Sequence, residues 1–447
     1  MNDTIVAIST ALGEGAISII RVSGDDAIKI INPLFEGKDL EKASSHTINY
    51  GHIVYNGEII DEVLLSIMKA PKTYTKEDVI EINTHGSIAV VNKIMEILLF
   101  EGCRLAEPGE FTKRAFLNGR IDLTESEGVM DLINSETELT RKMAINELSG
   151  NVSRLITDTR EDIISLISNI EVNIDYPEYE DIEVVTINKI REKVREIKEK
   201  LLKTLKLSED GKILKDGIKT VILGKPNVGK SSLLNALLEE EKAIVTDVKG
   251  TTRDIVEGSI LVGGVKLNLI DTAGVRKSDD IVEKIGIEKS LNLIDEAELV
   301  LLILDASCPL SEEDKYLLEK TKDKKRIIIM NKIDLNLNNS YMDDVIKISA
   351  KNNEGIEDIK DAIKKLFNVG TFMSKNLTFF TNVRQISLLK SAIKSLEDVE
   401  QGIKEEREID MIEIDLKLVW EKLGDIIGAN YTEELIDNLF SRFCLGK

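Results

Sequence analysis

The sequence lacks the features that mark secreted and membrane-spanning proteins. Its 447 residues include three cysteines, Cys103, Cys308 and Cys444, which are odd in number and far apart. This usage excludes a disulfide framework and favours a reducing compartment, the cytoplasm. The longest apolar run, Leu299–Leu304, is six residues long, whereas a transmembrane helix needs about 20. Met1–Thr4 opens no basic or apolar leader, so the sequence predicts neither a membrane span nor a signal peptide.

Basic residues are also in deficit. The chain has 59 Lys and Arg residues against 80 Asp and Glu residues, which gives a formal net charge of −21. Each contact with a nucleic-acid phosphate needs a local cation, so this balance argues against binding nucleic acid or an anionic membrane by overall charge. A nucleic-acid substrate then requires a local basic patch or a basic partner.

The first part of the chain, residues 1–118, is predicted to form a mixed α/β domain. A length of 447 residues predicts about three domains in all. In this part, short apolar runs alternate with glycine-containing turns, one of which joins two strands in a hairpin through Asn56 and Gly57. The expected elements are strands at Ile5–Ser9, Ile17–Val22, His52–Tyr55 and Ile59–Ile67 and a helix at Ile88–Leu99.

Residues 119–214 and 371–447 are predicted to be helical. From Asp122 to Ile174, apolar residues recur every three or four positions, which indicates long amphipathic helix in two pieces broken near Gly150. Further helices are expected over about 187–207, 384–406, 410–427 and 431–443.

Between the helical segments, residues 215–370 alternate short apolar strands with helices. This alternation is typical of a parallel sheet covered on both faces. The predicted fold class is therefore α/β plus all-α, with a doubly wound α/β domain inserted into a helical domain. The strands of the inserted domain are expected at Lys219–Leu223, Lys266–Asp271, Leu299–Leu304, Arg326–Met330 and Val345–Ile348.

The strongest chemical signal is a phosphate-binding loop. Gly224–Ser231 fits the pattern G-x-x-x-x-G-K-[ST] and lies between a predicted strand and a predicted helix. The glycines let backbone N–H groups surround the β-phosphate. Lys230 reaches the β- and γ-phosphate oxygens, and the Ser231 hydroxyl binds Mg²⁺.

Three further motifs follow in order, each after a predicted strand. Asp271–Gly274 offers a carboxylate that can hold Mg²⁺ through water and a glycine N–H for the γ-phosphate. Asn331–Asp334 ends in a carboxylate with two acceptor oxygens for the N1–H and exocyclic amine of guanine, and Ser349–Lys351 offers a backbone N–H to the guanine O6. The four motifs together predict a GTP site.

One expected residue is absent from this site. Ras-like GTPases place a water-orienting Gln after the second motif, and Val275 occupies that position here. Another group must therefore position the water and neutralise charge between the phosphates. Asn227 offers an oxygen to a monovalent cation, and an arginine finger in trans from Arg253 is the competing explanation.

The chain resembles the MnmE (TrmE) family of tRNA-modification GTPases over its whole length. The resemblance rests on the guanine-nucleotide motifs, on Gly250–Asp254, on Val282–Glu288, on Pro108–Phe116 and on the C-terminal Cys444–Lys447. The last two segments are the most specific. One small departure is Leu445, where the family more often has Ile.

The resemblance implies a homodimer with an inserted Ras-like P-loop GTPase domain. Its N-terminal domain is expected to dimerise and to bind 5-formyl- or 5,10-methylene-tetrahydrofolate. Its GTPase domains are expected to pair across the dimer with K⁺ and GTP, which activates hydrolysis. With an MnmG-like FAD protein, in a heterotetramer or larger assembly, the family forms 5-carboxymethylaminomethyl- or aminomethyl-uridine at the wobble position of certain tRNAs.

The motifs and the resemblance also assign site residues by position. Glu283 is expected to orient the catalytic water indirectly, and Lys230 to act on the phosphates. K⁺ is expected at Asn227, Thr246, Val248 and Thr251, Mg²⁺ at Ser231 and Thr252, and the folate at Arg21, Glu81, Arg120 and Lys447. The residues expected around GTP are Asn227, Val228, Gly229, Lys230, Ser231, Ser232, Thr246, Asp247, Val248, Lys249, Gly250, Thr251, Thr252, Asp271, Thr272, Ala273, Gly274, Asn331, Lys332, Asp334, Ser349, Ala350 and Lys351.

Without the resemblance, the folate residues have ordinary explanations. Arg21 follows an apolar strand and is explained as an edge-strand surface charge, and Glu81 as a solvated residue alternating out of a strand. Arg120 is explained as a helix-start charge, and Cys444 as an ordinary half-buried thiol.

A function of another class is a GTP-regulated ribosome-assembly factor. Such proteins bring a second GTPase domain or a basic RNA-binding module. This chain has one phosphate loop, and its C-terminal helices carry an acidic excess, so the modification enzyme is favoured.

Overall fold

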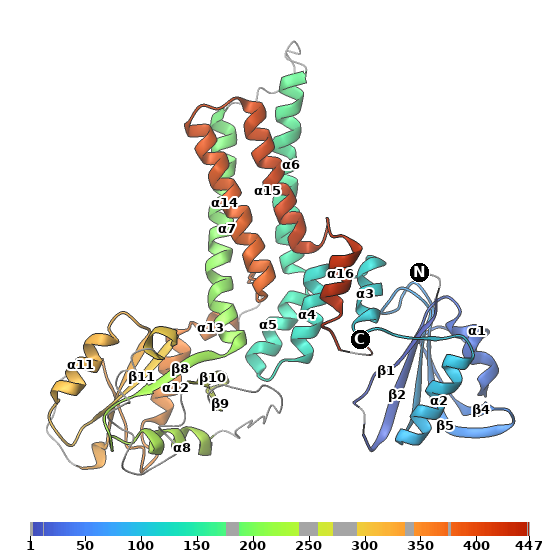
Figure 1. Ribbon diagram of the computed structural model, residues 1–447, viewed down its shortest axis with the longest axis horizontal. Coiled ribbons are helices and arrows are strands. Elements are labelled where there is room, and N and C mark those ends of the chain that lie inside the picture. The colour runs from blue at the N-terminus through green and yellow to red at the C-terminus, as the bar shows by residue number, and fades with distance from the viewer. Residues whose placement is uncertain are drawn as a thin grey trace. The chain divides into compact units, whose positions relative to one another are not determined.

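The fold is described by a computed structural model (Figure 1). It describes residues 3–11, 13–175, 187–240, 258–270, 293–335, 344–373, 377–444 and 446. The chain divides into two compact units. Unit 1 contains residues 1–133, 147–195 and 391–447, and unit 2 contains residues 134–146 and 196–390. Each unit is thus built from segments that are far apart in the sequence.

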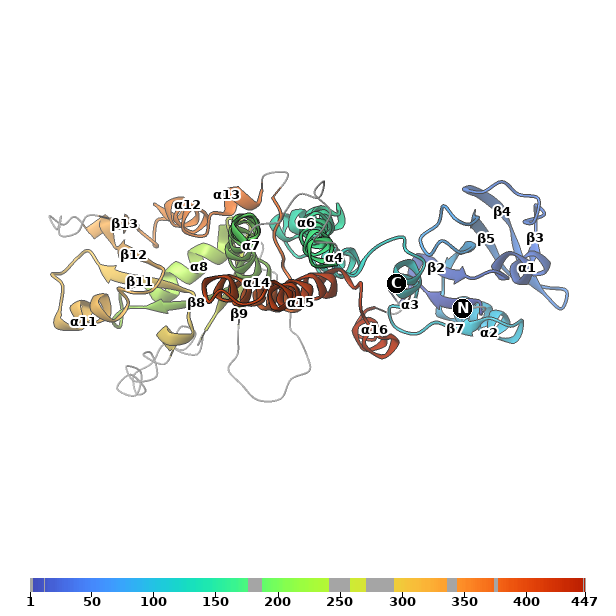
Figure 2. The same ribbon diagram turned by 90° about the horizontal axis from the view of Figure 1, so that it is seen from above.

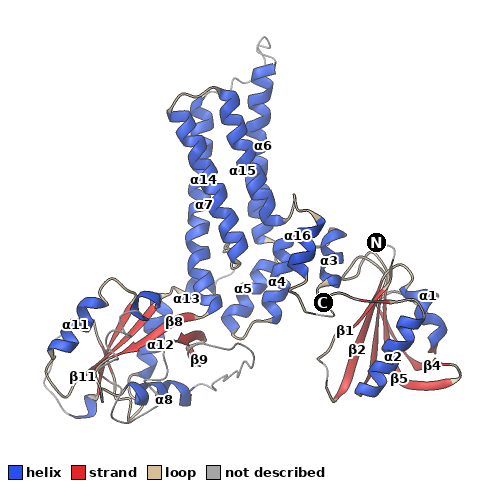
Figure 3. Ribbon diagram, in the orientation of Figure 1, coloured by secondary structure: helices blue, strands red, loops and turns tan. Residues whose placement is uncertain are grey.

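The N-terminal part of unit 1 is a seven-stranded sheet in the order β3-β4-β5-β6-β2-β1-β7, drawn in red in Figure 3. The two hairpin strands expected from Asn56 and Gly57 are β4 and β5, and this prediction is confirmed. The elements are β1 (Ile5–Ile8), β2 (Gly15–Ser23), α1 (Ala27–Ile31), β3 (Phe35–Glu36), β4 (Thr47–Tyr55), β5 (Glu58–Met68), β6 (Val79–Gly86), α2 (Ile88–Phe100), β7 (Arg104–Leu105) and α3 (Glu110–Leu117).

The two faces of this sheet differ. Successive side chains of a strand point to opposite faces, so Val63 and Leu65 of β5 are buried while Leu64 between them is 48% exposed. The buried face packs against α1 and α2 in one apolar cluster that includes Ile31 and Val91. On the opposite face, Ile5 and Ala7 of β1 are buried against Phe111 of α3, while Tyr50 and Leu64 are exposed.

The helical part of unit 1 follows the amphipathic pattern. In α15, Ile412, Leu416, Val419 and Leu423 are buried at three- and four-residue spacing, as expected for a helix with one apolar stripe. Figure 2 views α6 and α15 nearly end-on, where they lie side by side. The helices are α4 (Leu123–Ile133), α6 (Asn151–Asp175), α15 (Ile409–Ile427) and α16 (Glu433–Phe440), with parts of α7 (Ile187–Asp216) and α14 (Val383–Lys404).

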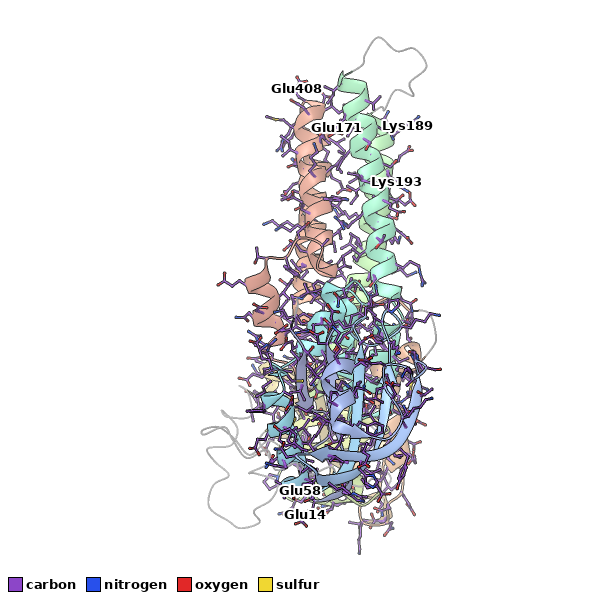
Figure 4. All side chains as sticks on the ribbon, turned by 90° about the vertical axis from the view of Figure 1, so that its right-hand side faces the viewer. Glu14, Glu58, Glu171, Lys189, Lys193 and Glu408 are labelled. Atoms are coloured by element: carbon purple, nitrogen blue, oxygen red, sulfur yellow. The ribbon has the colours of Figure 1, made fainter. Side chains whose placement is uncertain are left out.

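The outer faces of these helices carry charge. Figure 4 labels Glu171, Lys189 and Lys193 on this surface. Lys193 pairs with Asp162 at 3.2 Å, and Glu171 pairs with Lys417 at 2.9 Å. Exposed pairs of this kind contribute little, roughly 0–1 kcal/mol each. Among the residues that the structure describes, none of the helices is both long and apolar enough to cross a membrane.

The stretch after Asp122 is broken once more than the sequence interpretation expected. The break near Gly150 is confirmed, but a second break separates α4 from α5 (Glu138–Leu148). Thr137 and Thr140 exchange hydrogen bonds there: the Thr137 Oγ1 accepts from the Thr140 N–H at 3.0 Å, and the Thr140 Oγ1 accepts from the Thr137 N–H at 3.1 Å. Side-chain caps of this kind satisfy the unpaired N–H groups of a new helix, so the two threonines start α5 as a separate element.

Unit 2 contains a six-stranded sheet in the order β13-β12-β11-β8-β10-β9. Its central strand β11 is buried on both faces: Leu299, Leu301 and Ile303 pack in one apolar cluster, and Val300, Leu302 and Leu304 in another. Helices α8 and α12 line the first cluster and α11 the second. The elements are β8 (Ile218–Leu223), α8 (Lys230–Glu240), β9 (Gly258–Val262), β10 (Val265–Leu269), β11 (Leu299–Asp305), α11 (Glu312–Lys320), β12 (Arg326–Asn331), β13 (Ile346–Lys347), α12 (Ile356–Leu366) and α13 (Val369–Phe372).

The prediction of a parallel sheet is confirmed for five strands and wrong for the sixth. Strand β9, which the sequence interpretation missed, pairs antiparallel with β10. Its turn consists of Gly263 and Gly264, with φ angles of 60° and 78°. Two consecutive residues with positive φ make the tight hairpin turn that glycine favours. The Gly-Gly pair between two apolar runs was therefore the available signal for this strand.

Candidate active site

The phosphate loop lies between β8 and α8, as the motif predicts. Gly224 has a φ of 151°, and a Cβ on it would lie 2.5 Å from the Ile303 carbonyl oxygen. Gly229 has a φ of 100°, and a Cβ on it would lie 2.2 Å from the Asn331 Nδ2. Both motif glycines are thus required by backbone conformation and by close neighbours.

Lys230 points back into this loop from the first position of α8. Its Nζ donates to the carbonyl oxygens of Gly224 at 2.7 Å and Lys225 at 2.9 Å. Ser231 follows it in the first turn of α8, at the end of the helix toward which the backbone N–H groups point. A lysine ammonium at the positive end of a helix is an arrangement that attracts phosphate.

The loop is tied to the predicted guanine segments through Asn331. This residue is 3% exposed at the end of β12. Its Nδ2 donates to the Val228 carbonyl at 2.8 Å, and its Oδ1 accepts from the Ala350 N–H at 3.0 Å. One side chain therefore holds together the phosphate loop and Ser349–Lys351.

Asp334 lies beside the same segment. One of its carboxylate oxygens accepts from the Ser349 hydroxyl at 2.8 Å, and the residue is otherwise exposed. A carboxylate fixed in this way presents acceptors in a defined direction, as recognition of the two guanine donors requires. The structure thus brings Val228, Asn331, Asp334 and Ala350 into one site.

Lys332, the remaining charged residue of this motif, has a φ of 67° and pairs with Asp305 at the end of β11. The Nζ–Oδ2 distance is 2.6 Å. Burial opposes ionisation of Asp305, but the hydrogen bonds from Lys332 and Ser307 outweigh it and lower the pKa of this carboxyl. Asp305 is therefore a fixed negative charge that orients Lys332, and the sequence interpretation did not identify it.

Several predicted residues lie outside the described residues. They include the proposed water-orienting Glu283, the position of Val275, the alternative Arg253 and the C-terminal Lys447. The others are Thr246, Asp247, Val248, Lys249, Gly250, Thr251, Thr252, Asp271, Thr272, Ala273 and Gly274.

A second group of predicted residues meets in the N-terminal domain. Arg21 on β2 stands opposite Glu81 on β6, and its Nε donates to the Glu81 Oε1 at 2.9 Å. Its Nη1 also donates to the Gly446 carbonyl at 3.3 Å, which brings the C-terminal segment to this pair. Strand β2 lies inside the sheet, so the alternative of an edge-strand surface charge is wrong. The side chains of Arg21 and Glu81 are only 18% and 24% exposed.

Arg120 joins this group through Tyr74. Its guanidinium carbon lies 4.7 Å from the centre of the Tyr74 ring, and that of Arg21 lies 6.0 Å from the same ring. Cation–π contacts at this range are attractive. The Tyr74 hydroxyl is 2.9 Å from the Thr112 hydroxyl of α3. Tyr74 therefore lies in this group of side chains, and sequence reasoning missed it because a single tyrosine in a loop carries no motif.

A buried ion cluster supports α3 behind this group. Arg114 is 1% exposed and pairs with Asp3 at 2.7 Å, Glu110 at 3.0 Å and Glu77 at 3.1 Å. Arg104 also pairs with Glu110, at 2.5 Å. Burial opposes ionisation of Glu110, but the bonds from both arginines outweigh it and lower the pKa of this carboxyl. A charge as buried as that of Arg114 is tolerated only when it is paired in this way.

The strand–loop–helix around Gly224–Ser231, the order of the six strands and the guanine segments define the protein as a P-loop GTPase with a Ras-like domain. Two family descriptions match the chain: "MnmE helical domain" over residues 123–444 and "GTP-binding protein TrmE N-terminus" over residues 4–120. The chain therefore belongs to the MnmE (TrmE) family of tRNA modification GTPases, as the resemblance predicted.

Similar proteins extend over the whole chain. It is 54% identical over 450 residues to the tRNA modification GTPase MnmE of Streptococcus thermophilus, which covers 100% of this chain and 98% of that protein. It is 52% identical over 452 residues to the MnmE of Streptococcus pneumoniae strain D39, covering 100% and 99%. The solved G domain of the T. maritima FeoB iron transporter is 32% identical, covers 33% of this chain and 98% of that chain, and has a TM-score of 0.24.

Proposed function

We propose that this chain hydrolyses GTP to drive the formation of 5-carboxymethylaminomethyl- or aminomethyl-uridine at the wobble position of certain tRNAs, together with an MnmG-like FAD protein. The observation that carries the proposal is the end-to-end match to MnmE proteins, which covers 100% of this chain. It includes both the GTPase site and the N-terminal site around Arg21. The ribosome-assembly alternative is not favoured. Such factors carry a second GTPase domain or a basic RNA-binding module, whereas MnmE proteins match this chain from end to end.

Hydrolysis is assigned to the phosphate loop. Lys230 holds the β- and γ-phosphate oxygens after exchanging its bonds to the carbonyls of Gly224 and Lys225. Ser231 and Thr252 offer hydroxyl oxygens to Mg²⁺, a cation that prefers oxygen ligands and neutralises charge on the phosphates. Glu283 is proposed to orient the attacking water indirectly.

A K⁺ site is proposed at Asn227, with Thr246, Val248 and Thr251. Asn227 has a φ of 62° and is exposed within the loop, so its amide oxygen is accessible to a cation beside the phosphates. Asn227, Thr246 and Thr251 have side-chain oxygens, and Val248 has a backbone carbonyl oxygen. Oxygen ligands suit a hard monovalent cation. The test is turnover in K⁺, Rb⁺, Na⁺ and Cs⁺ at matched ionic strength. Equal rates in K⁺ and Na⁺ would contradict this site and favour Arg253 acting in trans.

A tetrahydrofolate carrying a one-carbon unit is proposed at Arg21, Glu81 and Arg120, with Lys447. The arginines and Lys447 supply cations for the carboxylates of the glutamate tail, and the Glu81 carboxylate supplies acceptors for the donors of the pterin. The position of Gly446, within 3.3 Å of Arg21, supports the contribution of the neighbouring Lys447.

A homodimer is proposed through the N-terminal domain. The sheet face opposite α1 and α2 exposes Ile17, Ile48, Tyr50 and Leu64 by 64%, 69%, 62% and 48% of their surfaces. Contiguous exposed apolar side chains on a sheet favour a protein–protein interface. Pairing of the GTPase domains across this dimer, with K⁺ and GTP, is proposed to activate hydrolysis.

The experiment that tests the proposed function is nucleoside analysis of bulk tRNA from a strain that lacks this gene. We expect the modified wobble uridine to disappear and to return when the chain is supplied from a plasmid. An unchanged nucleoside profile, accompanied by accumulation of immature ribosomal subunits, would instead support the assembly factor.

A further inference from the structure

A second side-chain interaction anchors the phosphate loop, and its partner residue lies outside the four nucleotide-binding motifs. Lys225 is the second residue of the loop, and its Nζ lies 2.7 Å from the Oδ2 of Asp314. Asp314 lies in α11, far along the chain. The Lys225 side chain is 20% exposed and the Asp314 side chain 3%, so this pair is shielded from water, which strengthens its attraction.

Neighbouring residues fix the position of the Asp314 carboxylate. Ser311 is the N-cap of α11 and forms a capping box with Asp314, whose Oδ2 accepts from the Ser311 N–H at 2.9 Å and the Ser311 hydroxyl at 2.8 Å. One turn later, Leu317 is buried in the apolar cluster that includes Leu302 of β11. The carboxylate is therefore fixed both by the helix cap and by the packing of α11 on the sheet.

The Lys225 residue connects this anchor to the phosphate-binding lysine. Its side chain binds Asp314, and its backbone carbonyl accepts from the Lys230 Nζ at 2.9 Å. The hydrogen bond with Asp314 raises the pKa of Lys225, so the side chain stays charged at neutral pH. The first half of the loop is thus tied to α11, just as the second half is tied to β12 through Asn331 and Val228.

We propose that Asp314 is a positioning residue for GTP, which holds the first half of the phosphate loop in its binding conformation through Lys225. It does not touch the nucleotide. The ion pair orders the Lys225 backbone before the nucleotide binds. Nucleotide binding therefore costs less conformational entropy. Loss of the ion pair should therefore speed nucleotide dissociation more than it slows the chemical step.

A direct electrostatic role of Lys225 makes the opposite prediction for one substitution. If Lys225 acts only by attracting the phosphates, Asp314→Asn removes a nearby negative charge and should tighten GTP binding. If Asp314 acts as an anchor, the same substitution should weaken binding. The sign of the change separates the two explanations.

The experiment uses the full-length chain and fluorescent mant-GTP and mant-GDP. We expect Asp314→Asn and Lys225→Met each to raise the Kd by about tenfold, mainly through faster dissociation. Saturating kcat should fall by a smaller factor. Lys225→Arg, which keeps a cation for the carboxylate, should stay near wild type, and the double variant Lys225→Met with Asp314→Asn should be no worse than either alone, because both remove one interaction.

Glu312→Gln is the matched control. It removes one negative charge from the same helical turn, but the Glu312 side chain is 91% exposed and pairs with Lys315. We expect wild-type affinity for this variant. Unchanged or tighter binding by Asp314→Asn would overturn the proposal. If Asp314→Asn unfolds below the assay temperature, the Lys225→Met variant provides the test. Wild-type affinity for GTP in Lys225→Met would also overturn the proposal.

Discussion

The two candidate sites of this chain are built in different ways. The nucleotide site is mainly backbone: glycines with positive φ, a helix end and a carbonyl that accepts a hydrogen bond from Asn331. The N-terminal site is mainly side chain: Arg21 and Glu81 pair across two strands, and Arg120 is held over Tyr74. Phosphate needs N–H groups that any sequence can supply once the backbone bends correctly. A ligand with distinct carboxylates and donors needs specific side chains.

This difference explains why the two sites are supported differently. The nucleotide site rests on close packing of backbone atoms, so a single added carbon damages it. The N-terminal site rests on α3, and α3 is held by the buried charges around Arg114. We therefore expect the first site to be sensitive to glycine substitutions and the second to loss of charge.

The largest expected effect is on the support of the N-terminal site. Arg114→Met keeps the side-chain volume but leaves the buried Glu110 and Glu77 without one of their cations, so we expect a loss of about 3 kcal/mol or more in the free energy of unfolding. Denaturant titration of the full chain measures this loss. Arg141→Met removes an exposed ion pair with Glu138 and should cost less than about 1 kcal/mol. Equal losses in the two variants would contradict the role given to the cluster.

The same cluster predicts a pH dependence. The pKa values of Asp3 and Glu110 are lowered in the folded chain, so their contribution to stability is present at neutral pH. It is lost as the pH falls from the ordinary values, 4.5 for Glu110 and 3.8 for Asp3, toward the lowered values, because the unfolded chain takes up protons in this range that the folded chain does not. The stability gap between wild type and Arg114→Met should therefore narrow in this range. A gap that stays constant down to the acid transition would count against the pairing.

The next largest expected effect is a loss of GTP affinity that leaves the N-terminal site unchanged. In Gly229→Ala, the new methyl group would meet the Asn331 Nδ2, and the φ of 100° is strained for alanine. Strain and a lost hydrogen bond together cost about 3 kcal/mol, or roughly 100-fold in GTP affinity. Binding of 5-formyltetrahydrofolate should remain. Gly370→Ala, where a Cβ meets nothing within 4 Å, is the control and should bind GTP normally.

A smaller change should alter which base is bound. Asp334→Asn replaces one carboxylate oxygen by an amide that faces the guanine amine, and the resulting mismatch costs about 1–3 kcal/mol. Competition titration should show weaker GTP binding and stronger xanthosine triphosphate binding. GTP affinity equal to that of wild type would mean that Asp334 does not read the base.

The smallest expected effect is on the N-terminal ligand. Arg21→Ala removes one of several cations, and we expect about a tenfold loss of 5-formyltetrahydrofolate affinity with GTP hydrolysis retained. A chain truncated after Cys444 should weaken binding as well. Lys38→Ala changes an exposed lysine of the same domain and should bind as wild type. If Arg21→Ala and the truncated chain both bind normally, the folate site has been placed wrongly.

Much of the fold could be predicted from the sequence, because both sheets and most helices follow simple periodicities. Leu299–Leu304 is apolar on both faces and forms the buried centre of the second sheet. Strand β9 was missed because its signal is a turn, Gly263-Gly264, and not a strand–helix alternation. The start of α5 was missed because its cap uses Thr137 and Thr140, two residues that are common on any helix surface.

The two candidate sites also differ in how much of each could be predicted from the sequence. The nucleotide motifs carry their own geometry, so Lys230, Asn331 and Asp334 could be identified from their spacing. Arg21 and Glu81 could be identified only by resemblance, since nothing local shows that β2 and β6 are neighbours. Tyr74 and Asp314 were missed for this reason too: each acts through a contact between distant parts of the chain.

The most direct test of the central claim is the wobble-uridine content of tRNA in a deletion strain that carries wild type, Gly229→Ala or Gly370→Ala. The account predicts full modification with wild type and Gly370→Ala. It predicts strongly reduced modification with Gly229→Ala, whose phosphate loop should bind GTP roughly 100-fold more weakly. Full modification by a Gly229→Ala protein that no longer hydrolyses GTP in vitro would contradict the coupling of this GTPase site to tRNA modification.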